Sequence, residues 1–303
     1  MLTADVERYV QLRQTLGFKL RDASRALRAF AQFAVTKGDT SLRASTAVAW
    51  AIEAPSPNAR YIRLQRVRHL AHFLHAEDPV HEIPPATLFR YAKVRHLPYI
   101  YMPDEVVQLL NAAGRLRNTY GLRRSVYRTL IGLIAATGLR VSEALDLRCD
   151  DVLPDGVLRI RHTKFGKTRL LPLHPTVASA LSRYLQRREY VNTTDDHVFL
   201  SASHRRISSS MVEYTFRRLL RLAQIGTTRT RRPRIHDLRH TFATRALERC
   251  PRSREAVARH FVALATYLGH SEIANTYWYL EATPALLTDI ATAAEALVAE
   301  EAP

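Results

Sequence analysis

The chain has 303 residues, of which 47% are hydrophobic, and its 45 lysines and arginines outnumber 28 aspartates and glutamates. This length is sufficient for two domains, each with its own buried core. No run approaches the roughly 18 uninterrupted apolar residues of a membrane helix, the first residues lack a signal-peptide pattern, and two cysteines provide neither a disulfide framework nor a Cys-x-x-Cys zinc site. We therefore expect a cytoplasmic protein without membrane contact.

The net charge of +17 is the strongest compositional signal. Arginine carries most of it, and the planar guanidinium group binds phosphate oxygens through two parallel hydrogen bonds. The excess is spread along the chain, because residues 1–100 hold 15 basic and 8 acidic side chains and residues 101–303 hold 30 and 20. This distribution predicts that much of the molecule contacts a nucleic acid, with an affinity that falls as salt rises.

Residues 1–82 are expected to form a small, basic, all-helical domain. Apolar side chains recur with helical spacing between residues 3 and 77, for example along 61–74. The Pro55–Asn58 stretch separates two of these helices, and Asn58 is a candidate N-cap. The polar faces carry four arginines, Arg60, Arg63, Arg66 and Arg68.

A proline-rich stretch, residues 83–102, is predicted to link this domain to a second one at residues 103–303, because closely spaced prolines disfavour helices and central strands. The second domain should be mainly helical with one small antiparallel β element, an α+β fold. Two short runs, 157–161 and 168–173, flank a turn with glycine and predict a β-hairpin. Helices are expected to begin near Pro103 and Ser142 and to cover about 174–190, 209–223, 236–249 and 253–268.

Basic side chains that could hold a phosphate occur at two places in the second domain. Arg140 follows Thr-Gly-Leu, where the glycine permits an abrupt turn, and lies just before the helix start predicted near Ser142. His236 and Arg239 lie three residues apart, hence on one helix face, whereas His240 should point elsewhere. Two guanidinium groups and an imidazole could stabilise the added negative charge of a pentacoordinate phosphate.

The remaining chemistry requires an acid and a nucleophile. Lys164 or Lys167, on the predicted hairpin, could protonate a departing oxygen. Tyr277 or Tyr279, seven and nine residues after His270, could attack phosphorus if nearby positive charge stabilised the phenolate. The sequence lacks the acidic clusters that bind two magnesium ions in nucleases, so no metal or other cofactor is expected.

In their order along the chain, six of these residues resemble the signature of the tyrosine recombinases, the family of phage integrases and Xer-like enzymes: Arg140, Lys164, His236, Arg239, His270 and Tyr279. Local words such as Ala-Thr-Gly-Leu-Arg-Val-Ser-Glu, His-Asp-Leu-Arg-His-Thr-Phe and Leu-Gly-His-Ser extend the likeness over roughly residues 100–285. The resemblance implies a catalytic domain at 103–303, preceded by a helical DNA core-binding domain at 1–82. It also selects Lys164 and Tyr279 over Lys167 and Tyr277, because their offsets from neighbouring motifs are those of the family.

The activity implied by the resemblance is site-specific DNA recombination, as in the integration, excision or transposition of a mobile genetic element. Tyr279 would attack a DNA phosphodiester to give a 3′-phosphotyrosyl link and a free 5′-hydroxyl, and a partner strand would reverse the step without ATP or a metal. The implied roles are transition-state stabilisation by Arg140, Arg239 and His270, proton transfer by His236 and general acid catalysis by Lys164.

The implied partner is double-stranded DNA with specific recombination sites. A homo-tetramer would act on two such sites in the nucleoid, alone or with related recombinases. Residues after Leu280 hold five acidic and no basic side chains, and an oligomerisation helix at about 283–299 would dock on a neighbouring subunit.

Two features depart from the family pattern: a longer stretch between Arg239 and His270, and the Tyr-Trp-Tyr run, in which Tyr277 competes with Tyr279.

Two other activities fit parts of the same sequence. A type IB topoisomerase-like relaxing enzyme would share the first half-reaction. A DNA-binding accessory protein could keep the fold without strand exchange, but it would need neither the phenol nor the lysine. The intact residue set therefore favours the recombinase.

Overall fold

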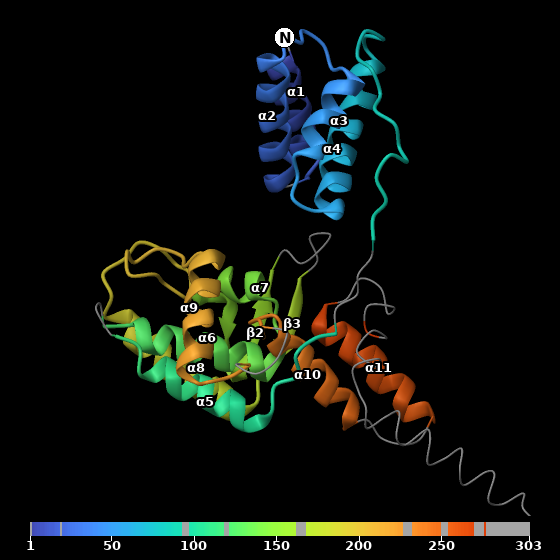
Figure 1. Ribbon diagram of the computed structural model, residues 1–303. Coiled ribbons are helices and arrows are strands. Elements are labelled where there is room, and N and C mark those ends of the chain that lie inside the picture. The colour runs from blue at the N-terminus through green and yellow to red at the C-terminus, as the bar shows by residue number, and fades with distance from the viewer. Residues whose placement is uncertain are drawn as a thin grey trace, which may run out of the picture. The chain divides into compact units, whose positions relative to one another are not determined.

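A computed structural model of the chain describes residues 2–18, 20–92, 97–117, 121–161, 168–226, 232–249, 254–269 and 276. The chain divides into two compact units, residues 1–96 and 97–303 (Figure 1). No helix within the described ranges has both the length and the apolar character needed to cross a membrane.

Four helices are described in the first unit: α1 (Leu2–Thr15), α2 (Arg21–Thr36), α3 (Ala44–Ile52) and α4 (Pro57–His75). Their apolar faces meet in one core, where the Phe30 and Trp50 rings lie 5.5 Å apart and Leu64, Val67 and Leu70 of α4 are buried. Figure 1 shows the four helices side by side. Helical periodicity had placed these apolar residues on one side of each helix, so the prediction of a helical N-terminal region is confirmed.

The start of α4 is capped by Ser56 and not by Asn58. Ser56 Oγ accepts a hydrogen bond from the Ala59 amide at 3.2 Å, and Pro57 occupies the first turn, where a missing N–H costs little. Asn58 instead pairs with the backbone of Ala92, donating to its carbonyl at 2.8 Å and accepting from its amide at 2.9 Å. The Asn58 prediction was wrong because the Ser-Pro pair starts the helix two residues earlier.

The four arginines expected on the polar faces of α4 also hold the first unit together. Each is half-buried and donates to a backbone carbonyl outside α4: Arg60 to Ala54, Arg63 to Trp50, Arg66 to Asp22 and Arg68 to Pro84. The Arg63 guanidinium also lies 4.8 Å from the centre of the Trp50 ring. These side chains therefore stabilise neighbouring segments in addition to supplying positive charge.

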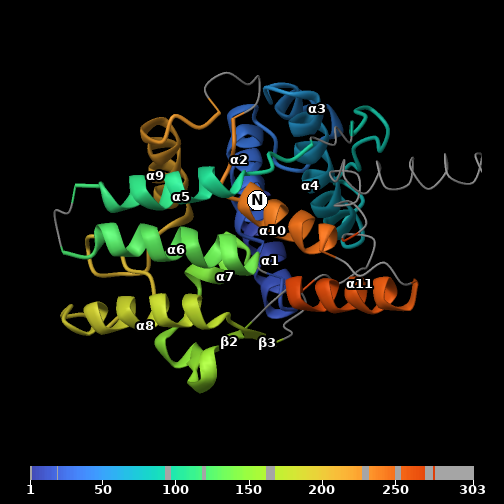
Figure 2. The ribbon, with the colours of Figure 1, turned by 90° about the horizontal axis from the view of Figure 1, so that it is seen from below.

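Helices predominate in the second unit, which also contains one small sheet (Figure 2). The helices are α5 (Pro103–Gly114), α6 (Arg123–Thr137), α7 (Val141–Leu145), α8 (Pro175–Glu189), α9 (Ser209–Leu222), α10 (Asp237–Glu248) and α11 (Arg254–Leu268), with 3-10 turns at Cys149–Asp151 and Pro154–Gly156. The antiparallel sheet has the order β1 (Val152–Leu153), β2 (Val157–Ile160) and β3 (Arg169–Pro172), with Leu158 opposite Leu171. The predicted fold class, mainly helical with a small antiparallel β element, is confirmed.

Helix α6 is central to the second unit and was missing from the prediction. It packs against α5, α8 and α10, and it buries a set of apolar side chains that includes Leu130, Ile131, Leu133 and Ile134. Because several elements cover it, its second half is almost continuously apolar and lacks the one-sided stripe that identifies a surface helix.

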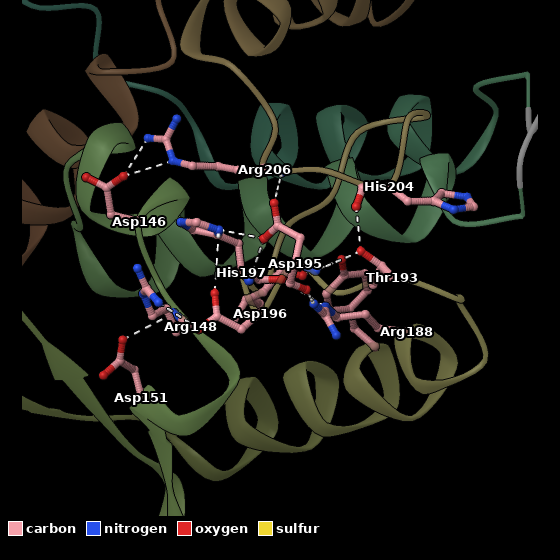
Figure 3. A network of polar contacts seen from close by, with 12 residues as sticks. Asp146, Arg148, Asp151, Arg188, Thr193, Asp195, Asp196, His197, His204 and Arg206 are labelled. Carbon is pink, nitrogen blue, oxygen red and sulfur yellow. Dashed lines mark hydrogen bonds and ion pairs between the residues drawn. The ribbon is translucent and has the colours of Figure 1, made fainter.

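A polar network fixes the loop at residues 190–208 to the rest of the second unit (Figure 3). Asp195 accepts hydrogen bonds from the backbone amides of His197 at 2.9 Å and Arg206 at 2.8 Å, and it is bonded to His197 Nδ1 at 2.6 Å. Although partial burial acts in the opposite direction, these hydrogen bonds lower the pKa of Asp195 to about 2. Arg206 also donates to Asp146, directly after α7, at 2.9 Å, so the loop is tied to α7.

Candidate active site

The chain turns sharply between α6 and α7. Gly138 ends α6 with φ +63°, and a Cβ at this position would lie 2.6 Å from Phe242 Cδ1 and 2.9 Å from Leu268 Cδ2. Glycine is required there because a side chain would disfavour the left-handed backbone and would collide with α10 and α11. Arg140 follows as the N-cap of α7, at the junction expected from the sequence.

Arg140 is held by Glu143 and by the backbone, while 31% of its side chain stays exposed. Its Nη1 donates to Glu143 Oε1 at 2.7 Å, and its Nη2 donates to the Gly269 carbonyl at 3.2 Å. The Glu143 carboxylate also accepts from the Arg140 amide at 3.0 Å. These contacts orient the guanidinium group and leave part of it accessible to an anion.

Arg239, on α10, is buried, with 2% of its surface exposed. Its Nη1 donates to the Gly138 carbonyl at 2.7 Å and its Nη2 to the Leu268 carbonyl at 2.8 Å. Both acceptors end helices, where carbonyls lack intrahelical partners and carry the negative end of the helix dipole. Arg239 thus joins the C-terminal ends of α6 and α11.

His236 stands at the N-cap of α10 and is partly exposed. Its ring lies 4.9 Å from the His240 ring, edge to face. The prediction that His240 points elsewhere was wrong, because residues four apart lie on the same side of a helix. Partial desolvation, followed by the charge of Arg239, lowers the pKa of His236 and favours a neutral imidazole that can accept a proton near neutral pH.

Three arginines bind three consecutive backbone carbonyls where α11 ends. The pairs are Arg169 Nε with Tyr267 at 3.0 Å, Arg239 Nη2 with Leu268 at 2.8 Å and Arg140 Nη2 with Gly269 at 3.2 Å. The guanidinium groups satisfy carbonyls that the helix itself leaves without partners. The next residue in the chain is His270.

Glu143 and Arg169 belong to this cluster, although no sequence motif had predicted a role in the site for either residue. The two nitrogens Nη1 and Nη2 of Arg169 donate to the two Glu143 oxygens at 3.1 and 2.9 Å, and the side chains are 11% and 8% exposed. Burial alone would raise the pKa of Glu143, but the hydrogen bonds and charges of Arg169 and Arg140 lower it. An arginine at the start of an otherwise apolar strand was the signal that could have identified this pair.

The chain enters the second unit along α10. The Tyr101 amide donates to Thr241 Oγ1 at 2.9 Å, and the Tyr101 hydroxyl donates to the Arg234 carbonyl at 3.1 Å. Burial raises the pKa of Tyr101, so its hydroxyl stays protonated and remains a donor. The start of the helix that carries His236 and Arg239 is thereby anchored.

The described residues bring together Arg140, His236 and Arg239 from the predicted set. The other residues singled out from the sequence lie outside the described ranges: Lys164, Lys167, Cys250, His270, Tyr277, Tyr279 and the helix expected at about 283–299. Two described residues close to them in sequence both belong to the arginine cluster: Arg169, two residues after Lys167, and Gly269, directly before His270.

One group of potential metal ligands occurs among the described residues, with ligand atoms of Asp195, Asp196 and His197 within 4.8 Å of one another. Asp195 is bonded to His197 and to the Arg206 amide, and Asp196 binds Arg148 at 2.7 Å. These contacts explain why the three side chains gather in the network of Figure 3, so their grouping does not identify a metal site.

Comparison with known proteins identifies the second unit. Residues 101–285, more than half of the chain, match the phage integrase family. The chain belongs to this family. It is a tyrosine-type site-specific recombinase, an enzyme that cleaves and rejoins DNA.

This tyrosine recombinase has curated relatives that match most of its length. It is 37% identical over 295 residues to the integrase/recombinase y4rB of Sinorhizobium fredii, a match that covers 94% of each chain. It is 32% identical over 218 residues to tyrosine recombinase XerC of Pseudomonas fluorescens, covering 71% of this chain and 67% of XerC.

The recombinase also shares its fold with lambda integrase. The structure of a lambda integrase tetramer bound to a Holliday junction aligns with 92% of this chain and 76% of that chain, with a TM-score of 0.63 and 17% identity. Lambda integrase has also been solved as a dimer bound to a COC′ core site. Lambda integrase is therefore seen on DNA both as a dimer, on a core site, and as a tetramer, on a Holliday junction.

Proposed function

We propose that this recombinase cuts DNA by attack of Tyr279 on a phosphodiester. A bond forms between the Tyr279 oxygen and phosphorus, and the bond from phosphorus to the 5′ oxygen breaks, which leaves a 3′-phosphotyrosyl link. Lys164 gives a proton to the departing 5′ oxygen, and His236 assists removal of the phenol proton. Attack by the 5′-hydroxyl of a partner strand reverses the step, so the bond energy is conserved without ATP or a metal in this scheme.

The convergence of Arg140 and Arg239 on the end of α11 is the observation that carries this proposal. They come from distant parts of the sequence, yet they donate to the carbonyls of Gly269 and Leu268, directly before His270. A pentacoordinate phosphate gains negative charge, and donors fixed beforehand stabilise it with little reorganisation. We assign this role to Arg140, Arg239 and His270.

The charge balance of the cluster favours an anionic substrate. Glu143 is one negative charge shared by Arg140 and Arg169, and Arg239 adds a third positive charge. The surplus would attract a DNA phosphate and would stabilise the phenolate of a tyrosine, whose ordinary pKa is near 10. A nucleophilic tyrosine beside this cluster is therefore chemically reasonable at neutral pH.

The partner that we propose is double-stranded DNA carrying specific recombination sites. Support comes from the net charge of +17 and from membership in the phage integrase family. We propose that a homo-tetramer acts on two such sites in the cytoplasm, at the nucleoid, alone or with related recombinases. Its affinity for DNA should fall steeply with salt, because binding releases counterions from the phosphates.

A groove on the second unit supports the proposed assembly. It has a volume of about 620 Å³, lies between α5, α6 and α8, and is lined by apolar side chains such as Leu110 and Leu181. Its exposed charged residues are Arg128, Arg183 and Arg187. The sequence after Leu280 is acidic and amphipathic, so we propose that the helix at about 283–299 of one subunit occupies this groove on the next.

A suicide DNA substrate tests the proposed chemistry. The duplex carries the recombination site with a nick that releases a short fragment on cleavage, so the cut strand cannot rejoin. The intact protein should become covalently attached to this DNA, and Tyr279→Phe should abolish the adduct. An undiminished adduct in Tyr279→Phe would contradict the assignment, and loss of the adduct in Tyr277→Phe alone would move the role to Tyr277.

The same assay separates the alternative activities. Adduct formation with relaxation of supercoiled DNA but without strand exchange would favour the topoisomerase-like enzyme. Specific DNA binding without an adduct would favour the accessory protein. Cleavage should persist in a chelator, and a strict magnesium requirement would count against the proposed mechanism.

A further inference from the structure

Arg169 begins β3 and connects this strand to Glu143 on α7 and to the end of α11. Its Nη1 and Nη2 donate to the two oxygens of Glu143, and its Nε donates to the Tyr267 carbonyl. The side chain is only 11% exposed. Each of its three guanidinium nitrogens therefore has an acceptor within the protein, which distinguishes Arg169 from the more exposed Arg140.

The first effect of Arg169 is on Arg140, through the carboxylate that both share. Oε1 of Glu143 accepts from Arg140 Nη1 at 2.7 Å and from Arg169 Nη1 at 3.1 Å, and Oε2 accepts from the Arg140 amide at 3.0 Å and from Arg169 Nη2 at 2.9 Å. A two-pronged arginine pair fixes the plane of a carboxylate. Without Arg169, the buried Glu143 would be free to rotate and would no longer direct Arg140 toward Gly269.

The second effect is on the end of α11. A Cβ on residue 269 would lie 2.6 Å from Arg169 Nη1 and 2.9 Å from its Cζ, so the guanidinium packs directly against the Gly269 backbone. The bond from Nε to the Tyr267 carbonyl satisfies one of the last acceptors of the helix. Arg169 thereby holds the residues immediately before His270 in a fixed place relative to Arg140.

We propose that Arg169 is a positioning residue for strand cleavage, acting through Glu143 on Arg140 and through Tyr267 and Gly269 on the turn before His270. The inference rests on the proposed function, because the roles of Arg140 and His270 in the transition state are assigned there. A lysine cannot replace Arg169, since a single ammonium group does not reproduce a planar fork directed at the carboxylate and the carbonyl.

Single-turnover cleavage of the suicide substrate, with saturating DNA, provides the main test. The variants are Arg169→Lys, which keeps the charge, and Arg169→Met, which keeps much of the length. Arg161→Met is the matched control, because Arg161 follows β2 in the same sheet and also binds carboxylates, with Nε 2.5 Å from Asp151 and Nη2 2.7 Å from Asp150. The rate constant, the final amount of adduct and the dissociation constant for the DNA are measured separately.

The rate constant for cleavage should be about 100-fold lower in both Arg169 variants, because misplacing reacting groups by roughly 1 Å can reduce a rate by this factor. The amount of adduct and the DNA affinity should be retained, and Arg161→Met should cleave at the normal rate. Loss of adduct amount at an unchanged rate constant would show partial unfolding instead and would overturn the proposal. An equal slowing in Arg161→Met, or a normal rate in Arg169→Lys, would also overturn it.

Hydrogen exchange separates this inference from the proposed function. The backbone amides of residues 265–269 should exchange faster in both Arg169 variants than in the unmodified chain and in Arg161→Met, because the end of α11 loses a partner. This comparison needs no DNA cleavage. Unchanged amide exchange in the Arg169 variants would overturn the positioning role. If exchange is faster in these variants as expected, but the unmodified chain forms no adduct at any tyrosine, only the proposed chemistry is overturned.

Discussion

The guanidinium group of Arg169 packs against the backbone of Gly269, where a Cβ would lie 2.6 Å from its Nη1. Gly269 also has φ +68°, a backbone conformation that residues with side chains rarely adopt. Two independent requirements therefore select glycine at this position. One is local backbone geometry, and the other is the presence of an arginine that also holds Glu143.

Substitution of Gly269 by alanine should separate these two requirements. Gly269→Ala displaces Arg169 and should slow single-turnover cleavage about 100-fold, with a loss of unfolding free energy of about 1–2 kcal/mol from the left-handed backbone. Gly121→Ala is the control, because Gly121 has φ +73° but no atom of the described residues lies within 4 Å of its Cβ position. Similar slowing in both variants would mean that backbone strain alone is responsible.

The lowered pKa of His236 predicts a pH dependence of cleavage. If the neutral imidazole accepts the phenol proton, the rate constant should fall as pH drops, with an inflection below the ordinary value of 6.5. His236→Gln should be slower and should lack this inflection. A single-turnover pH profile of both proteins measures the difference, and an inflection that persists in His236→Gln would assign it to another group.

The same shift affects stability, with a defined sign. The folded chain binds the His236 proton less readily than the unfolded chain, so the stabilisation by this group is present above about pH 6.5 and is lost as pH falls below it. The unfolding free energy of His236→Gln should therefore depend less on pH between about 5 and 7 than that of the unmodified chain. Parallel pH curves from denaturant titrations would contradict the shift.

The role of Arg63 as a structural link in the first unit can be tested by its removal. Arg63→Ala loses the hydrogen bond to the Trp50 carbonyl and the stacking on the Trp50 ring, so the unfolding free energy of this unit should fall by about 1–2 kcal/mol. Arg25→Ala is the control, because the Arg25 side chain is 82% exposed and its pair with Asp22 is long, at 3.8 Å. Denaturant titration followed by tryptophan fluorescence compares them, and equal losses would contradict a specific role for Arg63.

If the C-terminal segment docks on a neighbouring subunit as proposed, its removal should prevent tetramer formation on DNA. A chain ending at Ala282 keeps every residue assigned to catalysis, so it should still form the adduct, but sedimentation with DNA should show smaller complexes. Charge reversal in the groove, Arg183→Glu with Arg187→Glu, should have the same effect on complex size. Tetramers that persist in both proteins would show that the groove and the segment are not the contact.

Much of the fold could be predicted from the sequence because the apolar residues of surface helices lie on one side. This holds for α4, α8 and α9, and the hairpin strands β2 and β3 also follow their short apolar runs and turn. Helix α6 was not predicted, because a helix buried on several sides lacks the one-sided apolar stripe on which the prediction depends. The cap of α4 was misplaced because asparagine and serine are both good caps, and the proline decided between them.

Residues of the candidate site could be predicted where they lie in short, recognisable sequence motifs. Such motifs contain Arg140, His236 and Arg239, and the structure brings these three residues together. The contacts of Arg169 could not be predicted, since they join residues 143, 169 and 267, and no local spacing reports a distance across the fold. The ring contact of His236 with His240, in contrast, follows from helix geometry, because residues four apart share a helix face.

The anchoring of Tyr101 on α10 has a practical consequence for dissecting the protein. A truncated chain that begins at Pro103 would lack the hydroxyl that binds the Arg234 carbonyl and the amide that binds Thr241, and it would expose the apolar surface that Tyr99 and Tyr101 cover. A truncated chain that begins at Leu97 would keep all of these contacts. In the second fragment, and not in the first, α10 should therefore present His236 and Arg239 as it does in the intact chain.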